Sequence, residues 1–561
     1  MRVFVKYEKR KEQYIMKSRM KKLLSMGLVL SMVLSLAACQ NEKEQNVSND
    51  NKETENTVQS STVATESTEI DLYEATEYPE SVTVFTGRMA SKVKEGEEDY
   101  NASASFRLME EMTGTHVEWK LQDDFDQKFQ LMLASQKYDD VIVGNWKALG
   151  AEKAVEDGVI LNLSDYAEYM PNFMEFTRNN PDAAREYLSA DGEILYLPFL
   201  RLDSELSIAQ GLLMRTDWLD KLGLDVPTDP DSLYDVLVAF KTQDPNGNGQ
   251  ADEIPMSGKG TRTRLFPMFD TSDTFYVENG KVMYGPMTEN YDEALAYIAK
   301  LYSEGLYDEE YVMLGRSDLV GKITNNLVGM AYDYQPSAIH RTMAEVDPNF
   351  QFLGIPWFEN SKGVSVSNVA GDIARSTAWC AAISTQCENP ESVLKWLDSF
   401  YSEEAIEIMN FGEEGVTFNK VNGEFVYTDY ITKNPDKSLD VMLEWEIGSI
   451  SGCFPQLQLW DAYKQKLTEE GISSIETWAK ADKSMILPAL TFTAEENEKV
   501  TNIMSQVTTI VDEKKDKIIM GQESVDVMKE VREQLTKLGI DEVLAIYQAA
   551  YERYDTIALA E

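Results

Sequence analysis

The chain has 561 residues, of which 43% are hydrophobic and 26% charged, a composition typical of globular domains. Its formal net charge is −44 at pH 7. Such a negative surface repels nucleic acid, so we exclude nucleic acid as a partner. The chain holds only two histidines and has no Cys/His spacing for zinc, which disfavours imidazole-based catalysis and zinc binding.

The N-terminus indicates export. A basic stretch, 17–22, precedes an apolar run, 23–36, that ends in Leu36-Ala37-Ala38-Cys39. A basic region, a short apolar core and small residues at the cut form a secretory signal, and the run is too short to span a bilayer. Residues 1–38 are therefore predicted to be a signal peptide. Residues 39–75 are predicted to be a disordered linker, because they hold too little apolar surface to fold.

The ending Leu-Ala-Ala-Cys resembles the lipobox of bacterial lipoproteins. The resemblance implies that Cys39 is lipidated and becomes the first mature residue, which anchors the protein to the extracellular face of the cell membrane. An ordinary signal peptide that happens to contain a cysteine is the alternative.

Strand-like and helix-like segments alternate in the first part of the chain. Short β-branched and aromatic runs predict strands, and apolar positions at helical spacing predict helices. The predicted strands are 81–85, 115–119, 140–143 and 159–161, and the predicted helices are 105–113, 124–135 and 151–157. Such alternation predicts an α/β fold with a parallel sheet and helices on both faces.

The second half is richer in helix. The spacing predicts helices at 231–241, 291–302, 390–401 and 403–411, with strands at 327–332, 350–355 and 378–383. Residues 494–560 are almost entirely helical in pattern.

Several segments, in order, resemble the extracellular solute-binding lipoproteins of ABC importers (family 1 type), in particular those related to alginate-oligosaccharide binders. They are 213–224 followed by Val226-Pro227-Thr228, then 279–285, 301–306, 389–391, 401–404 and 412–416. The resemblance implies a two-lobed periplasmic-binding-protein-like fold over residues 76–561, with a hinge, a helix-rich second lobe and no catalysis. It also implies an oligosaccharide or other small solute as ligand and delivery to an ABC transporter permease. We expect the first lobe at roughly 80–200 plus a later return segment, the second at roughly 210–480, and a helical C-terminal part at 494–561.

A ten-residue run, 244–253, matches a calcium loop. Oxygen-bearing residues fall at positions 1, 3, 5, 7 and 9 with glycine at position 6, as calcium coordination requires. The predicted ligands are Asp244, Asn246, Asn248, Gln250 through its backbone carbonyl, Asp252 and Glu253. Pro255 occupies position 12, where an EF-hand has glutamate, and this departure fits the alginate-binder type. We expect a structural calcium ion; a turn that binds nothing is the alternative.

Ligand-binding residues are predicted at the carboxyl ends of strands, where open α/β lobes hold their ligands. The candidates at such ends are Arg88, Asn145, Trp146, Asp333, Tyr334 and Trp357, and Arg375, which flanks the start of another predicted strand, is a further candidate. Trp146, Tyr334 and Trp357 offer rings for stacking on sugars, although each is also a candidate for packing. Arg262, Arg264 and Arg375 are as well suited to pairing with carboxylates. Trp218 and Trp379 are expected to pack in the interior.

Two other functions stay open from the residues alone. Acidic residues are plentiful enough for a surface glycosidase or lyase, and a surface adhesin or scaffold would also need export and a tether. Cys380, Cys387 and Cys453 are an odd number in an oxidising compartment, and a Cys380–Cys387 disulfide is left undecided.

Overall fold

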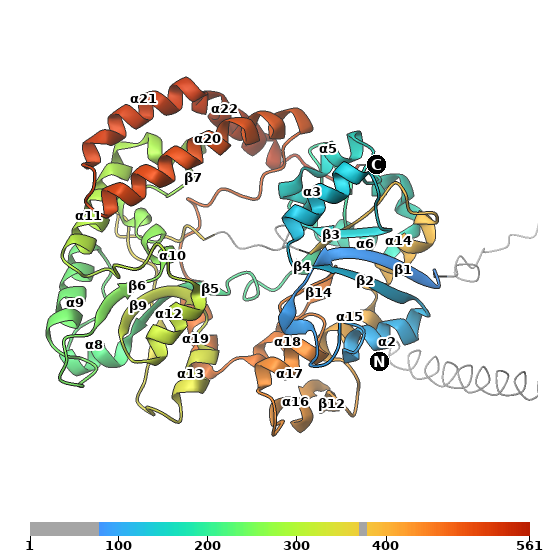
Figure 1. Cartoon of the computed structure of the whole chain (residues 1–561), viewed down its shortest axis with the longest axis horizontal. Coiled ribbons are helices and arrows are strands. Elements are labelled where there is room, and N and C mark those ends of the chain that lie inside the picture. Colours follow the sequence, from blue (N-terminus) through green and yellow to red (C-terminus); the bar gives the residue numbers. More distant parts are fainter. Residues whose placement is uncertain (1–77, 370–378, 561) are drawn as a thin grey trace, which may run out of the picture. The chain divides into compact units, whose positions relative to one another are not determined.

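The computed structural model describes residues 78–369 and 379–560 (Figure 1). The predicted signal peptide, Cys39, the linker and Arg375 lie outside the described residues. Within the described ranges, no helix is both long and apolar enough to cross a bilayer. Cys380, Cys387 and Cys453 are buried, and the structure forms no disulfide between Cys380 and Cys387, the bridge that the sequence left open.

The first sheet combines three parallel strands with one antiparallel strand. It contains β1 (Ser81–Gly87), β2 (His116–Gln122), β3 (Val141–Gly144) and β11 (Cys380–Ile383), in the order β11-β3-β1-β2. β1 pairs in parallel with β2 and β3, which confirms the predicted alternation, and β11 runs antiparallel to β3. The predicted strand at 159–161 is wrong. Its apolar side chains pack in the core, and only Ile160 makes an isolated bridge, to Ser384.

Local capping explains where the connecting helices begin and end. The Ser103 hydroxyl accepts a hydrogen bond from the backbone N–H of Phe106 at the start of α2 (Ala104–Thr113). Gly114 ends that helix in the left-handed conformation, at φ 74°. The Asp124 carboxylate caps α3 (Phe125–Ser135) in the same way as Ser103. These helices therefore form where the sequence predicts them.

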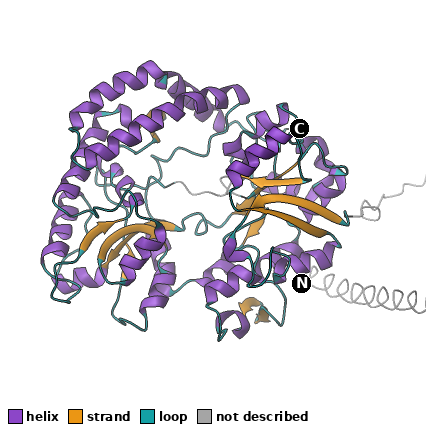
Figure 2. Cartoon of the chain, in the orientation of Figure 1, coloured by secondary structure: helices purple, strands orange, loops and turns teal. Residues whose placement is uncertain are grey.

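The second sheet has the order β10-β5-β9-β6. Its strands are β5 (Gln210–Arg215), β6 (Ile254–Ser257), β9 (Val328–Tyr334) and β10 (Phe352–Gly354). β6 and β9 are parallel, whereas β5 runs antiparallel to both β9 and β10. Figure 2 shows that helices flank the strands of both sheets. The flanking helices of the second sheet include α8 (Thr216–Leu222), α9 (Pro230–Thr242), α12 (Arg316–Thr324) and α13 (Ser337–Met343), and α11 (Glu289–Ser303) contributes to the same core.

Each sheet has its own hydrophobic core, and we call these two parts the first and second lobes. The chain passes between them several times. It leaves the first lobe after β4 (Phe199–Arg201) and returns before β11. It leaves again after β14 (Gln456–Gln458), which pairs in parallel with β4, and α19 (Glu469–Trp478) then packs against β10 and β5.

The expected extent of the second lobe, to about residue 480, therefore needs correcting. Residues from Cys380 to Phe454 contribute to the core of the first lobe, with α14 (Pro390–Ser399) and α15 (Glu403–Phe411) among them. A small separate core forms beside them around Phe411 and Leu443. Helical periodicity shows that these segments bury one face but not which sheet covers it.

The C-terminal part, expected to be helical, contains α20 (Ala494–Ile519), α21 (Met528–Leu538) and α22 (Ile540–Tyr554). All three join the core of the second lobe, and Arg262 pairs there with Asp516 of α20. The chain then ends on the first lobe, where Ile557 is buried and the backbone N–H of Ala560 donates to the carbonyl of Gly192.

The remaining elements are short. The strands form two hairpins, β7 (Phe275–Glu278) with β8 (Lys281–Tyr284), and β12 (Phe418–Val421) with β13 (Glu424–Tyr427). The helices are α4 (Trp146–Leu149), α5 (Ala151–Glu156), α6 (Pro171–Asn179), α7 (Pro181–Ala184), α10 (Lys259–Thr263), α16 (Asp429–Thr432), α17 (Leu439–Glu446) and α18 (Trp460–Tyr463).

Candidate functional site

A tyrosine and an ion pair meet at the carboxyl end of β9. Tyr334 is the last residue of β9 and is 40% exposed. Asp333 is buried and accepts two hydrogen bonds from Arg316, from Nε at 2.7 Å and from Nη2 at 3.1 Å. The guanidinium of Arg316 also lies over the Tyr334 ring, 5.0 Å from its centroid. The bidentate contact holds Arg316 in place while its side chain remains 56% exposed.

A second stack involves Tyr332 on the same strand. The Arg264 guanidinium lies 4.3 Å from the ring centroid of Tyr332, and its Nη1 donates to Asn368 Oδ1 at 3.1 Å. The Tyr332 hydroxyl donates to Gln210 Oε1 at 2.9 Å, and burial raises the pKa of Tyr332. Alternate residues of a strand point to one face of its sheet, so Tyr332 and Tyr334 lie on the same side of β9. We call Gln210, Arg264, Arg316, Tyr332, Asp333, Tyr334 and Asn368 the β9-end cluster.

The topology of the second sheet explains why these residues meet. β6 and β9 are parallel, so their carboxyl ends lie at the same edge. α10 follows β6 and is followed directly by Arg264. β5 is antiparallel to β9 and begins at that edge with Gln210, where the chain arrives from the first lobe. Open α/β sheets bind ligands beyond the carboxyl ends of their strands, so the β9-end cluster occupies the expected place for a ligand.

Arg88 and Asn145 follow β1 and β3, two neighbouring parallel strands of the first sheet. Arg88 Nε lies 3.0 Å from Asp123 Oδ1, and its Nη1 donates to the carbonyl of Glu98 at 3.0 Å. The Asn145 Oδ1 accepts from the backbone N–H of Ala148 at 3.0 Å and so caps α4. Both side chains lie at the predicted sheet edge, and each already has a structural partner.

Two predicted stacking residues are wrong for that role. Trp146 is 0% exposed, donates from Nε1 to the carbonyl of Ile142 at 3.0 Å and packs edge-on against Phe129. Trp357 is 3% exposed and lies in the core of the second lobe. A ring stacks on a sugar only if one face is accessible, so both are packing residues. Trp218 packs as expected, with its ring perpendicular to that of Phe240, and Trp379 is partly buried against the core of the first lobe.

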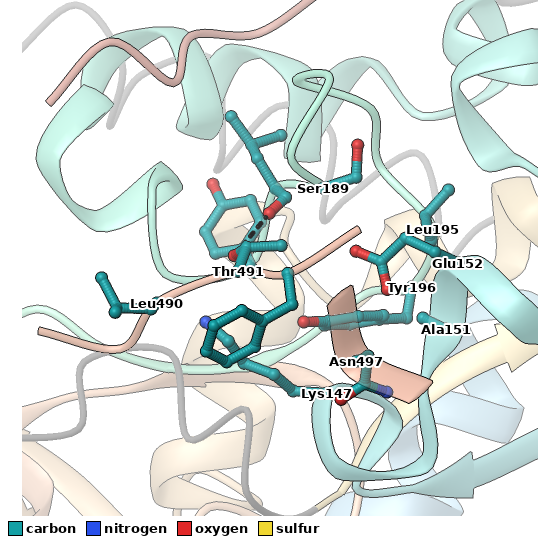
Figure 3. A pocket seen from close by; sticks show the side chains of 12 residues that line it. Lys147, Ala151, Glu152, Ser189, Leu195, Tyr196, Leu490, Thr491 and Asn497 are labelled. Carbon is teal, nitrogen blue, oxygen red and sulfur yellow. Dashed lines mark hydrogen bonds between the residues drawn. The ribbon is translucent and has the colours of Figure 1, made fainter. Parts of the chain in front are cut away.

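Two hollows lie elsewhere in the described residues. A cavity of about 20 Å³ near Lys147 and Thr491, drawn in Figure 3, has room for about one water molecule. Lys147 Nζ donates there to the carbonyls of Glu186 and Ala489, so the cavity marks where the chain before α20 is joined to the first lobe. A shallow hollow of about 580 Å³ between α3 and β2 is lined mainly by lysines and aliphatic side chains. Phe85, its single aromatic residue, is buried, so the hollow offers no ring for a sugar.

The predicted calcium loop connects α9 to β6. The Asp244 carboxylate accepts from the backbone N–H groups of Asn248 and Gly249, each at 3.1 Å. The side-chain amides of Asn246 and Asn248 donate to Asp252 at 3.0 to 3.1 Å. These contacts hold the predicted ligands in one compact turn.

Glu253 is the notable member of this loop. It is 9% exposed, and neither of its carboxylate oxygens has a hydrogen-bond partner among the described residues. Burial raises its pKa, and the charges of Asp244 and Asp252 act in the same direction. In the described ranges, no three His, Cys, Asp or Glu side chains converge closely enough to hold a metal ion, so Asp244, Asp252 and Glu253 do not form a finished carboxylate site in this structure. The predicted calcium shell also uses asparagine oxygens and a backbone carbonyl. A buried carboxylate without a partner, beside two further carboxylates, fits a cation as its missing partner.

Sequence reasoning missed Arg316 and left Arg264 undecided. Arg316 follows Gly315 at the start of a helix, a position with no local sign of a binding role. One general rule could have pointed to an arginine. A buried aspartate such as Asp333 needs a partner, and arginine is the side chain that best fits both carboxylate oxygens.

The chain folds into two α/β lobes that are linked by several chain crossings, and the second lobe carries a polar and aromatic cluster at the carboxyl end of β9. These features define a ligand-binding protein of the two-lobed class. More specifically, the chain belongs to the bacterial extracellular solute-binding protein family, whose profile matches residues 86–407. It is 26% identical over 485 residues to the fructooligosaccharide ABC transporter substrate-binding protein FusA of Streptococcus pneumoniae, covering 81% of this chain and 88% of FusA.

Solved structures agree on the fold. The alginate-binding protein AlgQ2, in a crystal structure without calcium ion, superposes with a TM-score of 0.70 at 24% identity and covers 84% of this chain and 98% of its own. An EF-hand mutant of S. pneumoniae FusA in complex with fructo-nystose gives a TM-score of 0.69 at 23% identity, covering 85% and 99%. These likenesses confirm the predicted two-lobed α/β fold.

Proposed function

We propose that this protein captures an oligosaccharide outside the cell and delivers it to the permease of an ABC transporter. The observation that carries the proposal is the exposed Tyr334 ring held beside the Arg316–Asp333 pair at the ligand edge of the second sheet. A ring face packs on the apolar face of a pyranose or furanose, and a guanidinium donates to its hydroxyls. FusA is described as a fructooligosaccharide-binding component of an ABC transporter and AlgQ2 as an alginate-binding protein, which supports a carbohydrate as the ligand.

In the proposed mechanism, the ligand first binds the β9-end cluster of the second lobe. Arg88 and Asn145 are the candidates to contact it from the first lobe, after a hinge closure of the kind that two-lobed binding proteins undergo. The chain crossings after β4, before β11 and after β14 are the segments that would bend. The closed, ligand-loaded form would be the one that the permease recognises.

We also propose a structural calcium ion in the loop between α9 and β6. Asp244, Asn246, Asn248, Asp252 and Glu253 would hold it, with the backbone carbonyl of Gln250. The ion would balance the carboxylates of the loop, above all the buried Glu253. Solved relatives described as an EF-hand mutant and as lacking calcium support a metal at this kind of site.

Export and lipid attachment at Cys39 complete the proposal. A lipid anchor followed by a long polar linker would keep the binding protein near its permease while allowing it to reach ligand. Replacing Cys39 with serine should release the protein from the membrane fraction into the medium, whereas retention in that fraction would contradict the anchor.

The test of binding is a titration of the purified protein with a panel of oligosaccharides, followed by calorimetry and by chromatography of the sugars. We expect heat of binding and a raised melting temperature, with the sugars recovered intact, because a ligand that binds only the folded state stabilises it. Shortened sugars would instead identify a glycosidase or lyase. No binding by any member of the panel would reject the proposal.

A further inference from the structure

We infer that the ligand of the β9-end cluster carries a carboxylate, and that Arg264 supplies the positive charge that selects it. The inference rests on the proposed function and deepens it, because it names the charge of the sugar.

The charge of Arg264 is not balanced by any acidic side chain in the described part of the chain. Its Nη1 donates to Asn368 Oδ1 and its guanidinium lies over the Tyr332 ring. Among residues 78–369 and 379–560 it forms no ion pair, and its buried Nε has no hydrogen-bond partner. This is unusual in a chain with a net charge of −44. Other arginines of the same lobe each form an ion pair with an aspartate. Arg215 pairs with Asp217, Arg262 with Asp516 and Arg316 with Asp333.

The cluster as a whole has an excess of one positive charge. Arg264 and Arg316 lie over Tyr332 and Tyr334, two alternate residues of one strand face. Asp333 compensates the charge of Arg316 through both of its oxygens and has none left for a second bidentate contact. Within the cluster, the guanidinium of Arg264 therefore has no carboxylate partner.

A half-buried guanidinium without a counter-ion is costly, because burial removes water that would otherwise solvate it. A neutral sugar would fill the cluster but leave that cost in place. A sugar carboxylate would remove it, since a guanidinium donates two parallel hydrogen bonds to a carboxylate. Local positive charge is also what an anionic ligand requires here, because the rest of the surface repels it.

Paired glycans that differ only in charge test this inference. We would titrate the full mature chain with trimers of galacturonate and of mannuronate, each beside its methyl ester, and with neutral fructan, mannan and glucan trimers. The expected result is that one acidic trimer binds and that its uncharged ester binds at least tenfold more weakly. The difference should shrink with added salt, as it does for charge attraction in a partly exposed site.

Variants assign the selectivity to Arg264. Arg264→Gln should weaken binding of the acidic trimer by roughly 10- to 100-fold and bring acid and ester to similar affinities, since a hydrogen bond to a charged group is lost. Arg264→Lys keeps the charge and should retain part of the preference. Arg178→Gln, which removes an exposed charge from the first lobe, should leave the acid-to-ester ratio unchanged.

The acid-to-ester ratio is a readout that a merely structural role of Arg264 would not change. Tight binding of a neutral trimer, or an unchanged ratio in Arg264→Gln, would overturn the inference and leave the proposed function standing. Failure of every trimer, acidic and neutral, to bind would reject both.

Discussion

Replacing Glu253 with glutamine should change the stability of the protein in opposite directions with and without calcium. Both carboxylate oxygens of Glu253 are buried and have no hydrogen-bond partner among the described residues. Without calcium, the negative charge is therefore desolvated and uncompensated, and glutamine removes it. With calcium, the same charge becomes a ligand, and glutamine weakens the site.

The size of each effect follows from the burial. A buried group left unsatisfied costs about 1–3 kcal/mol, and more when it is charged, but glutamine is itself polar and retains part of that cost. We therefore expect Glu253→Gln to stabilise the calcium-free protein by about 1 kcal/mol. Calcium at 100 times its dissociation constant stabilises the wild type by about 2.7 kcal/mol. A variant that binds calcium 10- to 100-fold more weakly loses about 1–2 kcal/mol of that gain.

The assay is urea unfolding followed by tryptophan fluorescence, in chelator and in excess calcium. Glu309→Gln is the matched control, because it removes an exposed carboxylate of the same lobe and should change neither midpoint. A Glu253→Gln midpoint that falls in both buffers would mean that Glu253 makes a stabilising contact without metal. A calcium-independent midpoint in the wild type would refute the calcium site altogether.

Three further predictions concern the ligand site, the pH dependence and the packing. Tyr334→Ala should weaken ligand binding about tenfold by calorimetry without lowering the melting temperature, because the ring is exposed; equal affinity would remove it from the site. Burial raises the pKa of Asp398 from 3.8 to about 6, so between these pH values the folded protein holds a proton on Asp398 that the unfolded chain has lost. The free energy of unfolding should therefore fall by about 3 kcal/mol as the pH rises from 4 to above 6. Urea unfolding of Asp398→Asn should show a flatter pH dependence than the wild type, and an equal slope would contradict the assignment. A methyl group on Gly211 would lie 2.2 Å from the Trp478 ring, so Gly211→Ala should destabilise by about 3 kcal/mol, whereas Gly321→Ala, in open helix surface, should not; equal melting temperatures for the two would contradict the close packing.

Local chemistry accounts for what the sequence determined. Apolar spacing and capping residues such as Ser103 and Asp124 act within a few positions, so the helices and strands of the first lobe could be predicted from short windows. The rule that ligands bind beyond strand ends selected Asp333 and Tyr334, which the structure places together at the edge of the second sheet. The loop from Asp244 to Glu253 could be found for the same reason, since all its candidate ligands lie in one turn.

Contacts between distant segments were decided only by the tertiary structure. Arg316 meets Asp333 because α12 lies beside β9, and Arg264 reaches Tyr332 because α10 follows a strand parallel to it. Trp146 follows a strand as a ligand-stacking residue would, yet it packs against Phe129 of another helix. The return of α14 and α15 to the first lobe has the same cause: burial of an apolar face can be predicted from the sequence, but the sheet that covers it depends on how the whole chain folds.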